Sequence, residues 1–583
     1  LSLNIHLKPR LCWNVVTVCG SPQKIDKALS KVFFNALPYL RVNRNIRTEF
    51  RHLPVKYQGL GIFDVNVERL GLKIFWIQRY WSEKCLEGQL LLYSFEAFSI
   101  SLGLDGNPFK YSFARFGYLA DSSWWKDLWE LLAHFGVRLE MDKSIPFQPY
   151  RLGDKSIMRW FTESSLFSKD QLTSLNRVRK RKCIFFLSEL LCSDGRTVKV
   201  PCLDGSEGLS RQKTYPFEKP TRADVNIWTS AIQSLTSTSY RLPQRLGMLQ
   251  NLDPNIDWFW NEQEQDDFLV RYNWNDEGAI RAYDCFTPSV GGTARSPQFK
   301  WNYSSHQRPD NLTHAATVRV VDDSTVRLHS STYVPLPPPI PSNLSEVLHS
   351  WGNNSLWEDL QLDGDGEWLI EGIMDGTVEG AADGSYMKDI CPDVCSAAFM
   401  LICNRSKRKL VGTWVEESPF AGNYRGEIFG GMALALILRA ASTFIPADSA
   451  TSPVKLWFDN SGVIHHGNKP HSDLLERQPQ ADVLSLLKRY IRATPFNIAF
   501  EKVASHVDDY RHVSTYTRQE TWNIEMDRIA KHAILAALES NTFITSPFPF
   551  ESVRVHTGFG KISGSPIEAI YDWHGYNTAK RLF

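Results

Sequence analysis

Four acidic residues in the C-terminal third of the chain stand where strands and helices are expected to begin or end. Asp383 and Asp459 each close a predicted strand, Glu427 lies in the first turn of a predicted helix, and Asp527 lies in the last predicted helix. Carboxylates at such edges can converge without entering the apolar core. Converging carboxylates form a site for a hard cation such as Mg²⁺. The set therefore predicts metal-dependent chemistry, and two ions roughly 3.5–4 Å apart would serve phosphodiester cleavage.

The elements that must position these carboxylates follow from the hydrophobic periodicity of the same region. Strands are predicted at 378–385, 395–403, 409–416, 454–458 and 496–503. Helices are predicted at 424–441, 482–491 and 522–538. This order of elements predicts an α/β domain with a mixed five-stranded sheet and flanking helices.

The local sequences around the four carboxylates resemble type 1 ribonuclease H domains. The family's carboxylate quartet has the same order as Asp383-Gly384-Ser385, Arg425-Gly426-Glu427, Phe458-Asp459-Asn460 and Asn523-Ile524-Glu525-Met526-Asp527, the last of which is expected to open the final helix. The resemblance implies that Asp383 bridges two metal ions, that Glu427 and Asp459 are further ligands, and that Asp527 completes the site. It also implies that the domain cuts the RNA strand of an RNA–DNA hybrid with two Mg²⁺ ions, or with Mn²⁺ in their place.

His506 follows the last predicted strand and is placed similarly to the mobile-loop histidine of that family. The resemblance implies a role in proton transfer and product release, which suits an imidazole near neutral pH. The loop from His506 to Asp527 is long for the family and contains Asp508-Asp509, so Asp508 is an alternative fourth ligand. Asp375-Gly376 imitates the first motif but lacks the serine that follows it.

Upstream segments resemble the region that follows the reverse transcriptase palm in non-LTR retrotransposon polyproteins. Residues 37–62 look like the thumb-like segment, and residues 175–195 look like the connecting region. The resemblance implies an upstream reverse transcriptase domain of the same polyprotein as a partner, and because the chain starts at Leu1 it is expected to be a fragment. Val321-Asp322-Asp323 is similar to the paired aspartates of a palm but is predicted to be a hairpin turn, so no DNA synthesis is expected.

The domain boundaries follow from these segments and from a proline-rich stretch at 335–341, which must be extended because proline fixes the backbone and removes a donor. The predicted parts are a mainly helical thumb-like segment at 1–81, a mixed connecting region of unknown role at 82–330, a Pro-rich linker at 331–365, a ribonuclease H domain at 366–540 and a C-terminal tail at 541–583.

Composition gives little general information about function. The chain has 65 Lys and Arg against 64 Asp and Glu, so nucleic-acid binding must depend on local patches. The basic run at 177–182 indicates either a solvated face or a phosphate-contacting strip. The scattered cysteines, with Cys391 and Cys395 closest together, indicate reduced thiols and an intracellular protein, in the nucleus or the cytoplasm. No apolar run reaches the roughly 18–20 residues of a membrane span, so no membrane partner is expected.

The leading hypothesis is a metal-dependent endonuclease that cuts RNA paired to DNA during reverse transcription of a retroelement. Selective cutting of RNA requires contacts with its 2′-hydroxyl groups. One alternative is an inactive copy that only binds nucleic acid or acts as a scaffold, which the intact acidic set disfavours. The other is a transposase or integrase of the same superfamily, which uses three acids and is disfavoured by Asp527 and the His506 loop.

Overall fold

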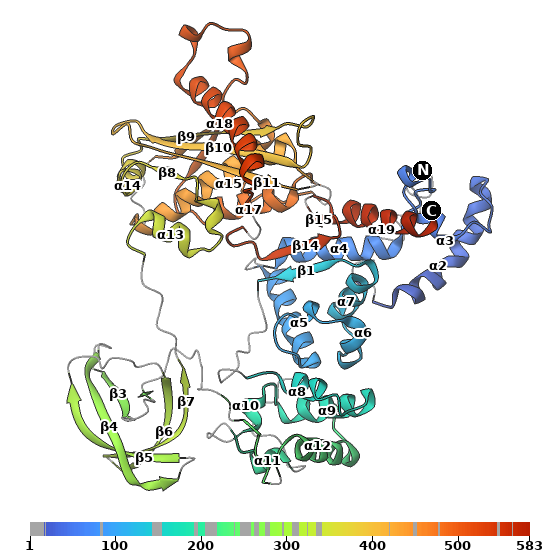
Figure 1. Cartoon of the computed structure of the whole chain (residues 1–583), viewed down its shortest axis with the longest axis vertical. Helices are drawn as coiled ribbons and strands as arrows, with labels where there is room; N and C mark the ends of the chain where they lie inside the picture. Colours follow the sequence, from blue (N-terminus) through green and yellow to red (C-terminus); the bar gives the residue numbers. More distant parts are fainter. Residues whose placement is uncertain are drawn as a thin grey trace. The chain divides into compact units, whose positions relative to one another are not determined.

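In the computed structural model, the chain, drawn in Figure 1, forms two compact units. The first unit comprises residues 1–91, 127–142 and 339–583, and the second comprises 92–126 and 143–338. The residues that the structure describes are 17, 19–81, 85–142, 154–191, 196–203, 218–237, 239–244, 246, 258–261, 268–274, 280–293, 296–305, 314–322, 324–333, 341–418, 420–446, 452–475, 478–544, 548–562 and 564–583. The predicted proline-rich stretch lies outside them, except for Pro341.

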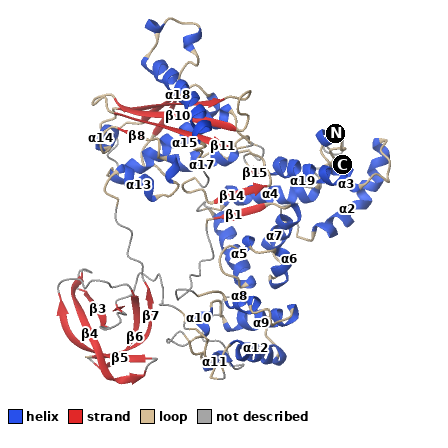
Figure 2. Cartoon of the chain, in the orientation of Figure 1, coloured by secondary structure: helices blue, strands red, loops and turns tan. Residues whose placement is uncertain are grey.

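A six-stranded mixed sheet forms the centre of the first unit's C-terminal domain (Figure 2). Its strands are β8 Gln361–Leu362, β9 Val378–Tyr386, β10 Val394–Cys403, β11 Lys409–Glu417, β12 Val454–Phe458 and β13 Ile498–Lys502. Their order is β13-β12-β9-β10-β11-β8, with β12 parallel to both of its neighbours and the other pairs antiparallel. The five predicted strands are present, but the prediction of a five-stranded sheet is wrong, because two-residue β8 is too short to show an alternating pattern.

Helices cover both faces of this sheet. They are α13 Leu344–Ser350, α14 Glu367–Met374, α15 Asn423–Ala441, α16 Ser461–Gly467, α17 Ala481–Arg492 and α18 Arg518–Ser540. Because side chains alternate along a strand, Ala382 of β9 joins the core that contains α15 and α17, whereas Ala381 packs with Trp522 and Met526 of α18. Asp383 follows Ala381 by two residues in β9, so its side chain lies on the same face of the sheet, the face that α18 covers.

The helix α15 is apolar almost all round. With the turn that follows it, it forms the one stretch among the described residues, Asn423–Phe444, that is long and apolar enough to cross a membrane by length and composition. Most of this stretch is buried, and α15 contacts β9, β10, α13 and α17. A helix that is covered on most sides needs apolar residues on most sides.

The last helix of the domain begins earlier than the sequence analysis predicts. Thr517 and Glu520 form a capping box, in which each side chain accepts a hydrogen bond from the other residue's backbone N–H. Such a box satisfies N–H groups that the first turn leaves without helical partners. The helix α18 therefore starts at Arg518, and Asp527 lies in its third turn. The prediction that the motif ending at Asp527 opens the helix is wrong.

The segment predicted as a C-terminal tail is structured. It contains β14 Val553–Thr557, β15 Gly560–Lys561 and α19 Pro566–Leu582. The strand β14 pairs antiparallel with β1, Arg138–Met141, and α19 packs on α4, Val65–Tyr80. A Cβ at Gly71 of α4 would overlap Ile567 of α19, so this glycine permits the close packing. The prediction of a tail is wrong because the partners of this segment lie several hundred residues earlier.

Before α4, the described residues of the first unit form two further α-helices. They are α2 Pro22–Ala36 and α3 Thr48–His52, separated by a 3-10 turn at Leu37–Leu40. Two longer helices begin in one unit and end in the other, namely α5 Leu86–Leu102 and α7 Trp124–Phe135.

The second unit contains short helices and a closed barrel. The helices are α6 Phe113–Phe116, α8 Ile157–Glu163, α9 Lys169–Lys182, α10 Leu187–Leu190, α11 Val200–Leu203 and α12 Arg222–Leu235. The barrel strands are β2 Trp258–Asn261, β3 Phe268–Trp274, β4 Ile280–Thr293, β5 Ser296–Ser305, β6 His314–Asp322 and β7 Thr325–Tyr333. The strands β6 and β7 are antiparallel, and Asp322 pairs with Thr325, which confirms the hairpin predicted there.

The basic run at 177–182 ends α9, and the protein itself engages several of its charges. Arg177 donates two hydrogen bonds to Asp224 at 2.9 and 3.0 Å. Arg179 is fully buried, and Lys180 pairs with Asp121 at 2.9 Å. Arg177, Arg179 and Lys180 are therefore engaged in contacts within the protein. This disfavours the hypothesis that the basic run is a phosphate-contacting strip.

Candidate active site

The structure brings three of the four predicted carboxylates together. Ligand oxygens of Asp383, Glu427 and Asp459 lie within 4.8 Å of one another. Asp383 is 4% exposed and Glu427 is 2% exposed, whereas Asp459 is half-buried. Burying like charges this close together is unfavourable unless protons or a cation neutralise them.

Two glycines let the strand and the helix approach closely enough to form this cluster. Gly384 follows Asp383 in β9, and Gly426, in the first turn of α15, precedes Glu427, which lies just past that turn and not within it as the sequence predicts. A Cβ at Gly384 would overlap the backbone nitrogen of Glu427, and a Cβ at Gly426 would overlap the carbonyl oxygen of Ser396 in β10. The backbones of β9, β10 and α15 therefore meet with no side chain between them, and this contact places the two acids side by side.

Arg425 anchors the start of α15 from the interior. Its Nε and Nη2 donate to the two carboxylate oxygens of Glu416 on β11, at 2.5 and 2.9 Å, and its Nη1 donates to Asp482 on α17 at 3.0 Å. Burial opposes the charge of Arg425, but Asp482 and Glu416 together raise its pKa well above the ordinary value. The ion cluster fixes the helical turn that carries Glu427. The sequence analysis missed this role, although Arg425 belongs to the motif that it quoted.

Glu427 has an unsatisfied carboxylate oxygen. Its Oε2 is buried with no hydrogen-bond partner among the described residues, and its Oε1 lies 3.4 Å from the side-chain nitrogen of Asn423. Burial, followed by the charges of Asp383 and Asp459, raises the pKa of Glu427 well above its ordinary value. A hard divalent cation satisfies this arrangement, because it takes several oxygen ligands and cancels their repulsion. The residues present therefore fit Mg²⁺ or Mn²⁺.

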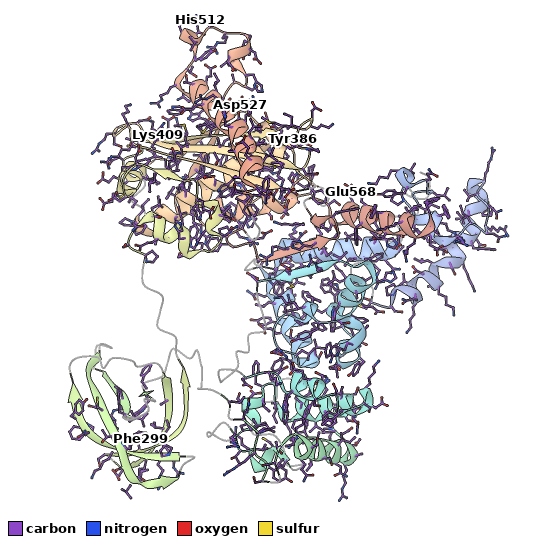
Figure 3. All side chains as sticks on the ribbon, viewed as in Figure 1. Phe299, Tyr386, Lys409, His512, Asp527 and Glu568 are labelled. Carbon is purple, nitrogen blue, oxygen red and sulfur yellow. The ribbon has the colours of Figure 1, made fainter. Side chains whose placement is uncertain are left out.

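Asp527, labelled in Figure 3, is carried by α18 and is not one of the three clustered carboxylates, but its charge acts on Asp383. Burial raises the pKa of Asp383 to about 8, with further contributions from the charges of Asp459 and Asp527. Asp527 also accepts a hydrogen bond from Lys531 at 2.6 Å, four residues further along α18. The sequence analysis missed Lys531, although the spacing of a helical ion pair was present.

The alternatives to these ligands are placed differently. The charge of Asp508 acts on Lys531, whereas the acids that raise the pKa of Asp383 are Asp459 and Asp527. This favours Asp527 over Asp508 as the neighbour of Asp383. Asp375, the alternative to Asp383, ends α14 and pairs with Arg405 at 2.5 Å.

His506 lies in the loop between β13 and α18. It is exposed, has a left-handed backbone with φ 47°, and is followed by the buried Val507. No hydrogen bond or ion pair joins His506 to the three clustered carboxylates in the part of the chain that the structure describes. The loop continues to His512, which Figure 3 shows at its far tip, away from Asp527.

The fold and the site together define a mixed α/β domain with a buried carboxylate cluster. No family model and no curated protein matches the chain. Among solved structures, the N-terminal RNase H domain of a Mycobacterium tuberculosis protein, determined as a fusion with maltose-binding protein, is similar over 28% of this chain and 97% of that chain, with 18% identity and a TM-score of 0.20.

Two further solved structures match a similar share of this chain. RNase H1 from the halophilic archaeon Halobacterium salinarum matches over 27% of this chain and 98% of that chain, with 16% identity and a TM-score of 0.19. The prototype foamy virus protease-reverse transcriptase matches over 27% of this chain and 20% of that chain, with 14% identity and a TM-score of 0.19.

Proposed function

We propose that the C-terminal domain, predicted at residues 366–540, is an endonuclease that hydrolyses the RNA strand of RNA–DNA hybrids. The observation that supports this most strongly is the cluster of Asp383, Glu427 and Asp459, in which one oxygen of Glu427 has no hydrogen-bond partner among the residues that the structure describes. Asp383 lies within β9, three residues before the strand ends and not at its close as the sequence predicts, Asp459 follows the last residue of β12, and Glu427 lies near the start of α15. The ligands therefore come from three parts of the fold.

Two divalent cations, Mg²⁺ or Mn²⁺, would supply an activated water and charge stabilisation for the departing oxygen. Asp383, whose neighbours are the other acids, would hold the cations from β9. Glu427 and Asp459 would hold the cations from α15 and β12, and Asp527 would complete the set from α18. His506, exposed in its loop, would carry a proton between the site and solvent.

The substrate assignment depends on the sugar of the RNA strand. Cutting RNA and sparing DNA requires contact with 2′-hydroxyl groups, while contacts with the DNA strand need reach only its phosphates. Sequence preference should therefore be weak. We further propose that the chain acts within a retroelement polyprotein beside a reverse transcriptase domain, in keeping with the motifs at 37–62 and 175–195.

Cleavage of a strand-labelled RNA–DNA hybrid by the full chain tests this proposal. We expect Mg²⁺-dependent cutting of the RNA strand only, none in EDTA, and none of double-stranded DNA or RNA. Asp383→Asn should abolish cutting, while Asp375→Asn, at the other Asp-Gly pair, should cut as the wild type does. Cutting of DNA would instead support the transposase or integrase alternative.

One observation favours a second function, that of a nucleic-acid-binding scaffold. Lys531 already neutralises Asp527, which would weaken the site for a second cation. A folded protein that binds the hybrid but cuts nothing in Mg²⁺ or Mn²⁺ would decide for the scaffold.

A further inference from the structure

The closed barrel of the second unit has exposed cations on one face of three neighbouring strands. Arg319 of β6 lies directly opposite Arg327 of β7, and Arg327 lies opposite Gln298 of β5. Lys300, two residues beyond Gln298, projects from the same face, because side chains alternate along a strand. Phe299, between these two, is 1% exposed and belongs to the barrel core, so the face is the outer one. Lys300, Arg319 and Arg327 are all exposed and form a cationic face.

No ion pair reaches this cationic face from the barrel residues that the structure describes. Arg327 donates to the uncharged side chain of Gln298 at 3.4 Å. Asp322, in the turn between β6 and β7, accepts from the backbone N–H and the hydroxyl of Ser324 at 2.9 and 3.0 Å. Like charges directly opposite each other destabilise a sheet. A bound anion would therefore stabilise the two arginines that face each other across β6 and β7.

Two aromatic side chains of β5 are exposed directly after the cation of that strand. Trp301 is 45% exposed and Tyr303 is 53% exposed. The ladder between β4 and β5 is irregular here, because Phe286 pairs with Trp301 and Cys285 with Tyr303, which leaves Asn302 as an extra residue. A bulge of this kind changes the direction of the side chains in the strand that contains it. It places both rings where a ligand can reach them.

Asp284 of β4 fixes the orientation of the Trp301 ring. Asp284 is 4% exposed and accepts hydrogen bonds from Ser304 at 2.5 Å and from Arg271 at 2.6 Å. Burial opposes its ionisation, but hydrogen bonds from Ser304, Arg271 and Trp301 lower its pKa. The donor of a tryptophan is its indole nitrogen, so this edge of the ring is held while the residue remains exposed. A ring that is already ordered loses little conformational entropy when a ligand stacks on it.

Exposed aromatic rings stack on nucleobases, and cations beside them bind the phosphates of the same strand. The bases of a duplex are stacked on their neighbours, so such rings suit unpaired bases. We propose that this surface of the barrel, formed by the cationic face with Trp301 and Tyr303, binds single-stranded nucleic acid. The site shares no residue with the carboxylate cluster and does not depend on the proposed nuclease activity. It would give the chain a contact with strands that a hybrid-specific nuclease does not cut.

Fluorescence anisotropy of labelled oligouridylate and oligothymidylate with the full chain tests this proposal. The measurement is made in EDTA, so that metal-dependent cleavage does not contribute. We expect binding of single strands and weaker binding of double-stranded DNA of the same length. An abasic strand, which keeps the phosphates and has no base to stack, should bind about tenfold more weakly. Equal affinity for the abasic strand, or tighter binding of the duplex, would overturn the proposal.

The two labelled strands also distinguish the source of the ligand. Tighter binding of oligouridylate would assign the surface to RNA strands, and tighter binding of oligothymidylate would assign it to DNA strands. Equal binding would mean that the surface contacts bases and phosphates without reading the sugar. Each of these results supports the proposal, whereas binding of neither strand would overturn it.

Loss of one exposed ring tests the stacking. Trp301→Ala should weaken binding about tenfold, as is typical for one stacked base. Trp76→Ala is the matched control, because Trp76 is 39% exposed on α4 of the first unit, and it should bind as the wild type does. Protection of the buried Cys285 thiol from alkylation shows that the barrel of each variant is folded. Wild-type affinity in a folded Trp301→Ala would overturn the proposal.

Loss of the two facing arginines tests the phosphate contacts and decides alone if Trp301→Ala does not fold. Arg319→Gln with Arg327→Gln changes exposed side chains and leaves the core intact. The slope of log affinity against log salt concentration should fall by about 1.4, because each phosphate contact of a single strand contributes about 0.7. Lys407→Gln with Arg408→Gln removes two exposed cations from the turn after β10 and should leave the slope unchanged. An unchanged slope in the barrel variant would overturn the proposal.

Discussion

Replacing Asp383 with asparagine should stabilise the metal-free protein while removing its metal site. Burial and the neighbouring acids raise the pKa of Asp383 from 3.8 to about 8. At about 1.4 kcal/mol per pKa unit, a shift of roughly four units means that the ionised side chain costs the native state about 5 kcal/mol. An asparagine carries no charge and keeps an oxygen to accept the Gly384 N–H, which lies 2.8 Å from Oδ1. We therefore expect a gain of about 3–5 kcal/mol at pH 9 in EDTA.

The dependence of this gain on pH has a defined sign. Because the folded protein holds the Asp383 proton more tightly than the unfolded chain does, the wild type loses stability as the pH rises from about 4 to about 8. At pH 6 about half of this loss of wild-type stability has occurred. The advantage of Asp383→Asn should therefore be about 2–3 kcal/mol smaller at pH 6 than at pH 9. Saturating Mg²⁺ should raise the free energy of unfolding of the wild type and leave that of Asp383→Asn unchanged.

Urea-dependent alkylation of Cys395 measures the unfolding of this domain within the full chain. Cys395 is fully buried in β10 and is a free thiol, so it reacts when the sheet opens. The control is Asp375→Asn, whose exposed side chain should change stability by no more than about 0.5 kcal/mol. The reasoning fails if Asp383→Asn is no more stable than this control in EDTA, or if its gain is the same at pH 6 and pH 9.

Three further predictions concern the neighbours of the cluster. Lys531→Met should raise the affinity for Mn²⁺ measured by calorimetry, since Lys531 competes for Asp527; a lower affinity would contradict this. Asp527→Asn should reduce hybrid cleavage by about two orders of magnitude, while Asp508→Asn should remain within about threefold of the wild type; the reverse order would make Asp508 the fourth ligand. Arg425→Met should cost about 3–5 kcal/mol in urea unfolding, because it leaves the buried Glu416 without its partner and leaves Asp482 only the more distant Lys561, at 3.9 Å; a loss below about 1 kcal/mol would refute the anchoring role.

Local patterns were sufficient to predict the central strands. Alternating or continuous apolar residues locate β9 to β13 within two residues at each end, because a buried strand leaves a periodic signal. The start of α18 was predicted too late, because its first turns lie in a polar stretch where apolar periodicity is weak. The capping box of Thr517 and Glu520 was the signal available there.

Other features depend on contacts that no local pattern contains. The strand β14 pairs with β1, and their sequences are separated by most of the chain. The ion cluster of Arg425 unites β11, α15 and α17; each element was predicted alone, but their adjacency follows from the tertiary fold. The barrel of the second unit was not predicted, because apolar and polar residues alternate too irregularly along its strands to distinguish them from loops.

Arg425 and Glu427, two positions apart in α15, both contact buried carboxylates, but only Arg425 brings a charge that neutralises them. Arg425 gathers two buried carboxylates and neutralises them, which completes the packing around the helix start. Two positions later, Glu427 meets two more carboxylates, and no ion pair with a basic side chain reaches Asp383, Glu427 or Asp459 among the residues that the structure describes. If those three acids served only to hold the fold, an arginine or an apolar side chain would serve better, because uncompensated buried charge destabilises it. The uncompensated charge of these acids therefore supports the proposal that the cluster is a ligand set for a divalent cation.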